Sequence, residues 1–204
     1  MYNPKHFNLS DLDLARQLID ERPLAALIGP DAQGHSFVSH LPLGWGADES
    51  GWWLEGHMAR ANPHGAWLAQ QREALAVFSG PDGYVSPSHY DTHLAVPTWN
   101  YLAVHVYGQV ELIDAPLAKD HLLKRLIARH EPGYAAQWIE LPEDYKEKLL
   151  GAIVGFRIRV TRWEAKAKLS QNRAASERER LRAHFAGQGA RGQDMVSWME
   201  RLGI

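Results

Sequence analysis

The first half of the chain alternates between short apolar runs and turn-forming residues, which is the pattern of β-strands. Four such runs are predicted as strands, at residues 23–29, 35–43, 52–55 and 74–78. Only a short polar segment separates the first two runs, so they are expected to form an antiparallel hairpin. Gly80-Pro81-Asp82-Gly83 has the composition of a turn, and the fourth strand is expected to end there.

The second half of the chain predicts longer elements. A strand is expected from Asn100 to Ile113, where large side chains occupy both alternating faces, so both faces should be largely covered. Residues 153–163 return to a strand pattern that places Arg157 and Arg159 on one side. Apolar residues three and four positions apart predict helices, at residues 11–21, 115–130, 142–150, 176–185 and 193–202.

A basic corner follows the strand at residues 52–55. Arg60 comes after the strand, and Pro63 fits the first turn of a helix, where free backbone N–H groups add to the guanidinium as anion donors. His57 and Asn62 supply further polar side chains. The segment is therefore predicted to bind a phosphate. The alternative is a strand end whose arginine pairs with an acidic residue, as surface arginines commonly do.

Composition fits a single large domain, with room for a helical appendage. The chain has 204 residues, of which 45% are hydrophobic, enough for a sizeable core. No run approaches the roughly 18 apolar residues that a membrane span needs, and the first residues show no apolar signal core. Cysteine is absent, which excludes a disulfide framework and a thiol nucleophile. We expect a cytoplasmic protein that does not bind membranes.

The net charge of −2 hides an uneven distribution. Residues 1–155 carry 11 lysines and arginines against 19 acidic residues, whereas residues 156–191 carry 10 against 3. The basic segment 157–191 could contact DNA, a phosphate-bearing ligand or an acidic surface of a second subunit, or simply face water. The last two predicted helices are joined by a Gly-rich linker of seven residues, 186–192, which is longer than the turn of a helix-turn-helix.

The sequence does not support three other kinds of site: a dinucleotide-binding site, a zinc site and a hydrolase active site. Gly187-Gln188-Gly189-Ala190-Arg191-Gly192 matches the dinucleotide fingerprint, but it follows a helix and not a strand. His89 and His93 have the spacing of zinc ligands on a helix, but Pro87 and Pro97 indicate a loop, so no metal site is predicted. The sequence lacks the Gly-x-Ser-x-Gly motif of hydrolases, and no catalytic residue is assigned.

The order of hairpin, strand with a basic corner, short helix and strand resembles the split-barrel flavin-binding proteins related to pyridoxamine phosphate oxidase. Four stretches narrow this resemblance: Met1-Tyr2-Asn3-Pro4, Tyr84-Val85-Ser86-Pro87-Ser88, Val96-Pro97-Thr98-Trp99-Asn100-Tyr101 and Lys168-Leu169-Ser170-Gln171-Asn172-Arg173. Together they are similar to the PaiB-type family of FMN-binding negative transcriptional regulators. There is one departure, because His89 stands where a bulky aromatic residue is expected after Ser-Pro-Ser.

The resemblance implies a β-rich α+β fold. Residues 1–173 would form an FMN-binding split β-barrel with peripheral helices, and residues 174–204 a C-terminal helical extension. It also implies a homodimer in which both subunits contribute residues to each flavin site.

An FMN site needs cationic and amide donors for the phosphate, and apolar contact and edge donors for the isoalloxazine ring. The phosphate would take the basic corner, with Lys168 reaching in from a partner subunit. Trp99 could instead be a core aromatic residue, and the stretch 170–172 could cap the following helix. The residues assigned to FMN are Ser39, His40, His57, Arg60, Asn62, Trp99, Asn100, Lys168, Gln171 and Asn172.

Two functions are compatible with this reading. The resemblance implies a dimeric FMN-binding repressor of transcription. The alternative is a flavin-dependent oxidoreductase that passes a hydride between a nicotinamide, or another small donor, and a small acceptor. No site for a nicotinamide phosphate is evident in the sequence, although the flavin would itself supply the redox chemistry.

Overall fold

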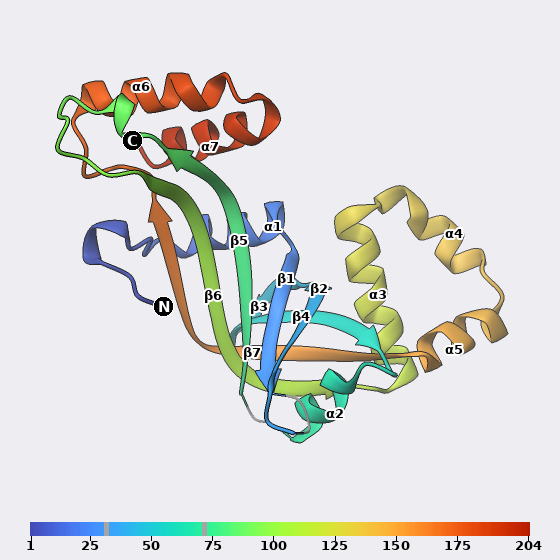
Figure 1. The fold of residues 1–204 in the computed structure, drawn as a ribbon. Helices are drawn as coiled ribbons and strands as arrows, with labels where there is room; N and C mark the ends of the chain where they lie inside the picture. Colours follow the sequence, from blue (N-terminus) through green and yellow to red (C-terminus); the bar gives the residue numbers. More distant parts are fainter. Residues whose placement is uncertain (31–32, 71–72) are drawn as a thin grey trace. The chain divides into compact units, whose positions relative to one another are not determined.

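The structure is a computed structural model that describes residues 1–30, 33–70 and 73–204. In these ranges, seven strands form one sheet in the order β2-β1-β5-β6-β7-β4-β3 (Figure 1). The strands are β1 Leu24–Pro30, β2 Ser36–Pro42, β3 Gly44–Asp48, β4 Gly51–Ala59, β5 Glu73–Val85, β6 Thr98–Ile113 and β7 Ile153–Lys168. The β-rich α+β fold expected from the sequence is confirmed.

Among the residues that the structure describes, seven α-helices and three short 3-10 helices accompany the sheet. The α-helices are α1 Leu12–Glu21, α2 Pro63–Gln70, α3 Pro116–His130, α4 Ala135–Glu140, α5 Glu143–Gly151, α6 Ala175–Ala186 and α7 Gly189–Arg201. The 3-10 helices are η1 Lys5–Phe7, η2 Pro87–His89 and η3 Pro132–Tyr134. Within the described chain, no helix is long and apolar enough to cross a membrane.

The described chain divides into two compact units. Unit 1 comprises Met1–Ala15, Ser79–His105 and Glu164–Ile204, and unit 2 comprises Arg16–Phe78 and Val106–Trp163. Strands β5, β6 and β7 each contribute residues to both units. The predicted boundary between residues 173 and 174 stays a prediction, and helices α6 and α7 belong to unit 1.

Unit 2 contains the predicted hairpin and a second hairpin that the sequence pattern did not indicate. Strands β1 and β2 pair antiparallel with Ile28 opposite Val38, and β3 pairs with β4 with Gly44 opposite Glu55. Strand β4 then pairs antiparallel with β7. The core of this unit contains fully buried side chains of β1, β4, β5 and β7, among them Leu27, Leu54, Phe78, Phe156 and Ile158.

The last two helices, α6 and α7, contribute buried side chains to the core of unit 1. Leu181 and Phe185 of α6 and Trp198 of α7 are buried. A side chain at Gly83 of β5 would lie 2.4 Å from the Phe185 ring, and one at Gly192 of α7 would lie 1.8 Å from the Phe185 carbonyl oxygen. These two glycines therefore permit the close packing of strand and helices.

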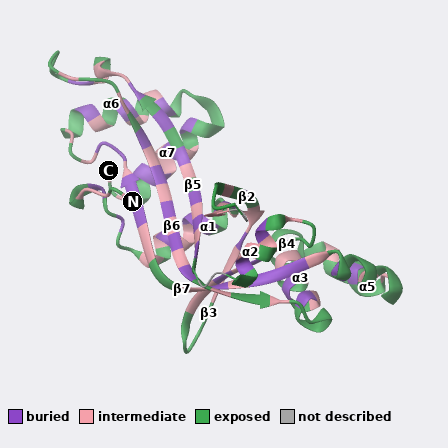
Figure 2. Ribbon diagram, turned by 60° about the horizontal axis from the view of Figure 1, so that its bottom comes forward, coloured by how far each residue is buried: buried purple, intermediate pink, exposed green. Residues whose placement is uncertain are grey.

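Strand alternation is visible in the burial pattern (Figure 2). Along β6, buried positions from Asn100 to Gly108 alternate with half-buried ones, so the expectation that both faces are covered is confirmed there. Arg157 and Arg159 of β7 lie on one side, as predicted, with both guanidinium groups over the ring of Trp53.

Two local predictions were wrong. The turn expected at residues 80–83 is part of β5, because Gly83 serves the contact with Phe185 and Pro81 is buried within the strand. The seven-residue linker expected between the last helices is reduced to Gly187 and Gln188, because α7 begins at Gly189. Helices α6 and α7 therefore form a tightly connected helical hairpin.

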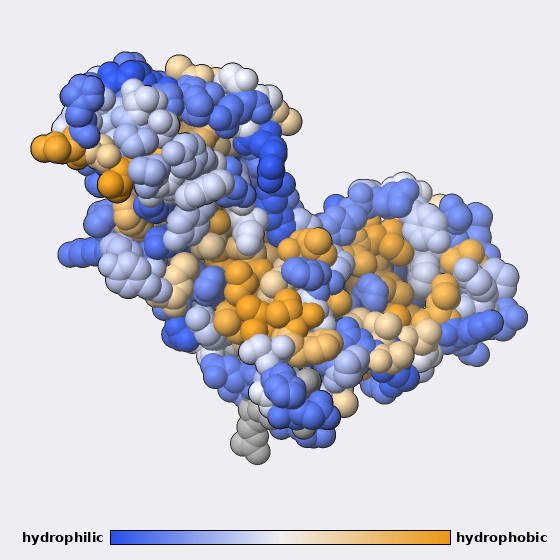
Figure 3. All heavy atoms as spheres, viewed as in Figure 1, coloured by the Kyte–Doolittle hydropathy of each residue, from blue (hydrophilic) through white to orange (hydrophobic). Residues whose placement is uncertain are grey.

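Apolar side chains reach the surface in both units (Figure 3). In unit 1 they come from the loop before β6, where Leu94 and Val96 are exposed. In unit 2 they come from the segment of α3, α4 and α5, where Leu117, Ile139 and Tyr145 are exposed. Single exposed apolar residues are common on protein surfaces, but grouped ones indicate binding surfaces.

Candidate functional site

A cavity of about 160 Å³ in unit 1 gathers residues from two of the family motifs, 96–101 and 168–173. It lies beside the start of β6, the end of β7 and the loop that follows β7. Its lining residues are Phe7, Tyr90, Val96, Thr98, Lys168, Ser170, Asn172 and Arg173. Two of the residues predicted for FMN, Lys168 and Asn172, thus share one cavity.

Lys168 supplies a cation to this cavity. Its ammonium group donates a hydrogen bond to the hydroxyl of Thr98 and lies 6.0 Å from the centre of the Phe7 ring. Burial lowers the pKa of Lys168, while Tyr101 acts in the opposite direction and Lys166 lowers it further. An anionic ligand would relieve this cost by giving the ammonium group an opposite charge.

Asn100 lies behind the cavity wall and is fully buried. Its side-chain oxygen accepts a 2.9 Å hydrogen bond from the hydroxyl of Ser170, which lines the cavity. Among the described residues, the side-chain nitrogen of Asn100 has no hydrogen-bond partner. A buried unsatisfied amide is costly, and such groups occur where a ligand or water completes the bonding.

The loop after β7 is held in an unusual conformation. Ser170 has a φ of +64°, a left-handed backbone conformation that side-chain-bearing residues rarely adopt. Gln171 stabilises the loop, because its side chain accepts from the amide of Leu169 at 2.7 Å and donates to the carbonyl of Ala167 at 2.6 Å. Gln171 therefore neither caps α6 nor lines the cavity, whereas Asn172 does line it.

Trp99 is half exposed, with 51% of its surface accessible. Its ring meets the ring of Tyr84 edge-on at 6.0 Å between centroids. Trp99 is therefore not a core aromatic residue in this chain, which was the alternative to a role in binding the flavin ring.

In unit 2, Ser39 and Asn62 meet in a network with His64. The side chain of Asn62 accepts from the amide of His64 at 3.0 Å, which caps the start of α2, and donates to the hydroxyl of Ser39 at 3.1 Å. That hydroxyl is also 2.9 Å from Nδ1 of His64. Burial lowers the pKa of His64, which favours the neutral ring. His64 was not singled out from the sequence, although the Asn-Pro-His order at a helix start could have indicated it.

The two histidines predicted for FMN, His40 and His57, also lie in unit 2. His57 of β4 is partly buried, and within the described chain its Nδ1 has no hydrogen-bond partner. Burial lowers the pKa of His57. His40 of β2 is exposed. Neither has a bond described with the Ser39, Asn62 and His64 network.

Arg60 is held by the end of α5 and the start of β7. Its Nε donates to the carbonyl of Gly151 at 2.9 Å, and Nη2 donates to the carbonyl of Ile153 at 2.9 Å. The same guanidinium pairs with Asp114 through both terminal nitrogens. The alternative considered for the basic corner, an arginine paired with an acidic residue, is thus present in the structure.

Asp114 also serves a second cation. The buried ammonium group of Lys119 lies 3.1 Å from Asp114 and donates to the carbonyl of Leu150 at 2.6 Å. Hydrogen bonds from Arg60 and Lys119 lower the pKa of Asp114 to about 2. One carboxylate between two cations leaves one excess positive charge at this corner.

The cations of the basic segment 157–191 are divided between the two units, and most of them have partners in the described chain. Its residues up to Trp163 belong to unit 2 and the rest to unit 1. Arg157 pairs with Glu55, Arg159 with Asp48, and Arg180 with Asp91. Other cations of the segment lie over aromatic rings or bind carbonyls, namely Arg162, Lys166, Arg173 and Arg178.

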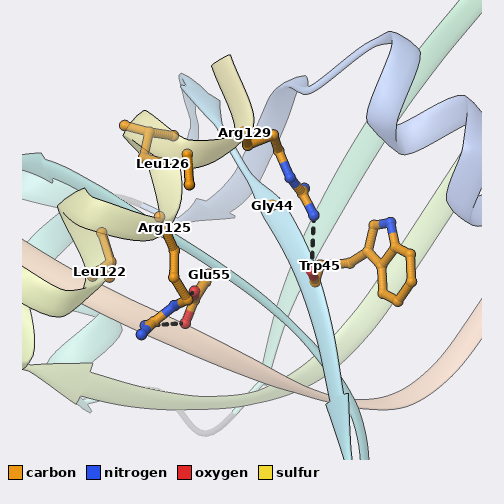
Figure 4. A pocket seen from close by; sticks show the side chains of 9 residues that line it. Gly44, Trp45, Glu55, Leu122, Arg125, Leu126 and Arg129 are labelled. Carbon is orange, nitrogen blue, oxygen red and sulfur yellow. Dashed lines mark hydrogen bonds and ion pairs between the residues drawn. The ribbon is translucent and has the colours of Figure 1, made fainter. Parts of the chain in front are cut away.

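A second cavity, in unit 2, was not anticipated from the sequence. It has a volume of about 340 Å³ and lies between α3 and the strands β3 and β4 (Figure 4). Arg125 and Arg129 extend into it from the helix, and Glu55 faces them from β4.

Comparison with known proteins gives one family match and several relatives. Residues 1–162 match the family described as "Putative FMN-binding domain". The chain is 33% identical over 178 residues to the protease synthase and sporulation protein PAI 2 of Bacillus subtilis, covering 85% of this chain and 83% of that protein.

Two solved structures resemble the fold. An FAD- and haem-binding protein from Mycobacterium smegmatis has a TM-score of 0.64 at 22% identity, over 84% of this chain and 78% of that one. The flavocytochrome Anf3 from Azotobacter vinelandii has a TM-score of 0.62 at 19% identity, over 79% and 69% respectively. At these identities the likeness establishes the fold.

Proposed function

The chain belongs to the family of FMN-binding domains, and from this premise we propose that it is a homodimeric FMN-binding protein that acts as a negative regulator of transcription. The observation that carries the flavin part is the cavity of unit 1, which is lined by both the half-buried Lys168 and Asn172. The regulatory part is supported by the resemblance of the motifs at residues 84–101 and 168–173.

The residues of the unit 1 cavity suit the isoalloxazine ring. Its pyrimidine edge carries carbonyl oxygens and ring nitrogens, which would be matched by the ammonium group of Lys168 and the amide of Asn172. The unpaired nitrogen of the buried Asn100, bonded to the cavity residue Ser170, fits the same demand for donors. A cation at this edge would stabilise negative charge on the reduced ring.

The size of this cavity supports a dimer. Its volume of about 160 Å³ is below the roughly 300 Å³ at which ligand pockets begin. One subunit can therefore enclose only part of a flavin. Leu94, Val96 and Trp99 are 96%, 73% and 51% exposed around the start of β6, and Val96 lines the cavity. We propose that a second copy covers these side chains and completes the site.

The phosphate contact predicted for Arg60 is a separate proposal within unit 2. Two carbonyls fix the guanidinium, and Asp114, with half of its side-chain surface exposed, occupies the anion position beside it. A phosphate would replace Asp114 at Arg60, while Asp114 would keep its contact with Lys119. Asn62, which is two residues further along, would add an amide donor only by giving up its bond to Ser39.

Contact with DNA through residues 157–191 has less support. Most cations of this segment are already paired with carboxylates, carbonyls or aromatic rings of the same chain. The relative named for protease synthesis and sporulation is consistent with a regulatory role, but its name does not specify how regulation is exerted.

The test is flavin binding by the purified protein. We expect absorption in the flavin range after purification or after addition of FMN, and a Lys168→Ala variant that binds FMN about ten- to a hundredfold more weakly, as expected for the loss of one charge-assisted contact. Lys124→Ala is the matched control, because Lys124 pairs with Asp120 on α3 and lines neither cavity. Equal affinities in all three proteins would remove Lys168 from the site.

The oxidoreductase alternative has its own readout. If bound FMN is reduced by a nicotinamide much faster than free FMN is, orientation by the protein is contributing to hydride transfer. We expect no such acceleration. Stopped-flow absorbance at the flavin band decides between the two functions.

A further inference from the structure

The cavity between α3 and the β3–β4 hairpin has the features of a second binding site. Arg125 and Arg129 are one helical turn apart on α3 and both extend toward the strands (Figure 4). The family motifs include neither residue. The volume of about 340 Å³ is in the range of small-molecule pockets.

Both arginines are held in place by acceptors on the protein. The Nε and Nη2 of Arg125 bind the carboxylate of Glu55, which is 11% exposed and also accepts from Arg157 at 3.0 Å. Arg129 donates to the carbonyl of Trp45 at 3.0 Å and lies 3.2 Å from Asp20. These contacts fix the orientation of each guanidinium before any ligand arrives.

Gly44 makes the position of Arg129 possible. A side chain at Gly44 would place its first carbon 2.8 Å from Nη1 of Arg129. Any other residue at this position would push the guanidinium away from β3. The strand is thus shaped to admit a cation at the edge of the cavity.

Each guanidinium retains donors that its described contacts do not use. An arginine side chain has five N–H groups, and the contacts above engage two nitrogens of each arginine. Counting the ion-pair partners Arg157 and Asp20 with Arg125, Arg129 and Glu55, three arginines face two carboxylates, which leaves one excess positive charge at the cavity. A singly charged anion would balance this excess, whereas a dianion would exceed it.

The rest of the wall is apolar. Leu122 is buried, and Leu126 and Ala128 continue the same side of the cavity. An inorganic anion would leave this surface uncovered. A cavity with guanidinium groups and an apolar wall suits a ligand that has a charged end and an apolar body.

We propose that this cavity binds a small organic monocarboxylate with an apolar body about the size of one ring. The carboxylate lies between Arg125 and Arg129, which present the N–H pairs that suit its two oxygens. The body packs against Leu122 and Leu126. This site is distinct from the flavin contact proposed for unit 1, and it does not depend on flavin binding.

The test uses benzoate as the probe, followed by NMR shifts of the backbone amides and by calorimetry on the full chain. We expect saturable shifts at Gly44, Trp45 and Gly56. Benzamide, which lacks the charge, and inorganic phosphate, which lacks the apolar body, should each bind at least tenfold more weakly. Phosphate binding as tightly as benzoate would overturn the proposal of an apolar subsite.

Three variants and one control locate the probe. Arg125→Gln and Arg129→Gln should each weaken benzoate about tenfold or more, as expected for the loss of a charge-assisted contact. Arg159→Gln is the matched control, because Arg159 pairs with Asp48 and does not line the cavity. Ala128→Trp fills the cavity from the exposed side of the helix, so it should fold normally and abolish benzoate binding. Unchanged affinity in Ala128→Trp would place benzoate elsewhere and overturn the proposal.

Discussion

Arg60 and Asp114 are joined through both terminal guanidinium nitrogens, although 54 residues separate them in the sequence. Arg60 also closes the end of α5 by binding the carbonyl of Gly151. The residue predicted to bind phosphate thus has a structural partner in this chain, and the carboxylate occupies the position that an anion would take.

The exchange of Asp114 for phosphate can be tested with two variants. If Arg60 binds the phosphate of FMN, Arg60→Ala should weaken FMN binding about ten- to a hundredfold, the range expected for a lost charge-assisted contact. Asp114→Asn should tighten it, because the competing charge is removed. Fluorescence titration of FMN measures both. If neither variant changes the affinity for FMN, Arg60 does not bind the phosphate and serves only to hold the end of α5.

Asp114 should make stability depend on acid pH. Its pKa in the folded protein, about 2, lies below the ordinary value of 3.8, so its stabilising effect is fully present above about pH 4 and is lost as the pH falls through 2. The difference in unfolding free energy between the wild type and Asp114→Asn should therefore shrink between pH 4 and pH 2. Urea unfolding at several pH values measures it. A difference independent of pH would contradict the ion pair.

A homodimer that covers the start of β6 should be sensitive to charge at Trp99. Trp99→Lys would place an ammonium group in the apolar contact that we propose, and we expect dissociation to monomers and weaker FMN binding. Leu117→Lys is the control, because Leu117 is exposed on α3 of unit 2. Light scattering after gel filtration gives the mass. A dimer of Trp99→Lys as stable as the wild type would place the interface elsewhere.

Binding to DNA should be weak if most cations of segment 157–191 are already paired. A slope of log affinity against log salt no steeper than about −2 corresponds to about two phosphate contacts. The triple variant Arg178→Ala, Arg180→Ala, Arg182→Ala should change that slope little. Anisotropy titrations of genomic fragments at several salt concentrations test this. A slope near −5 that the triple variant flattens would restore the segment as a DNA-binding surface.

The contact between α6 and α7 should tolerate no side chain at Gly192. In Gly192→Ala the added carbon would meet the Phe185 carbonyl at 1.8 Å, so the helices must separate, and we expect a loss of about 1–3 kcal/mol in unfolding free energy. Gly187→Ala is the control, because its nearest neighbour would be 3.5 Å away. Thermal or urea unfolding compares them. Equal stability of the two variants would contradict the close packing.

The sequence by itself determined the elements whose signals are local. The β1–β2 hairpin and the helix after Pro63 follow from alternation and from the helix-start chemistry of proline. The face shared by Arg157 and Arg159 follows from the two-residue repeat of a strand, whatever the strand pairs with. The resemblance of the motifs to a known family predicted the fold class and the flavin cofactor.

Only the tertiary structure decided what each polar residue contacts. Gly80 to Gly83 has the composition of a turn, but the packing of Phe185 on Gly83 favours an extended strand. Asp114 reaches Arg60, Thr98 reaches Lys168, and Arg129 reaches the carbonyl of Trp45 across separations of 54, 70 and 84 residues. Periodicity fixes which face of an element a side chain occupies, whereas the partner on that face depends on strand order and helix packing, which local patterns do not encode.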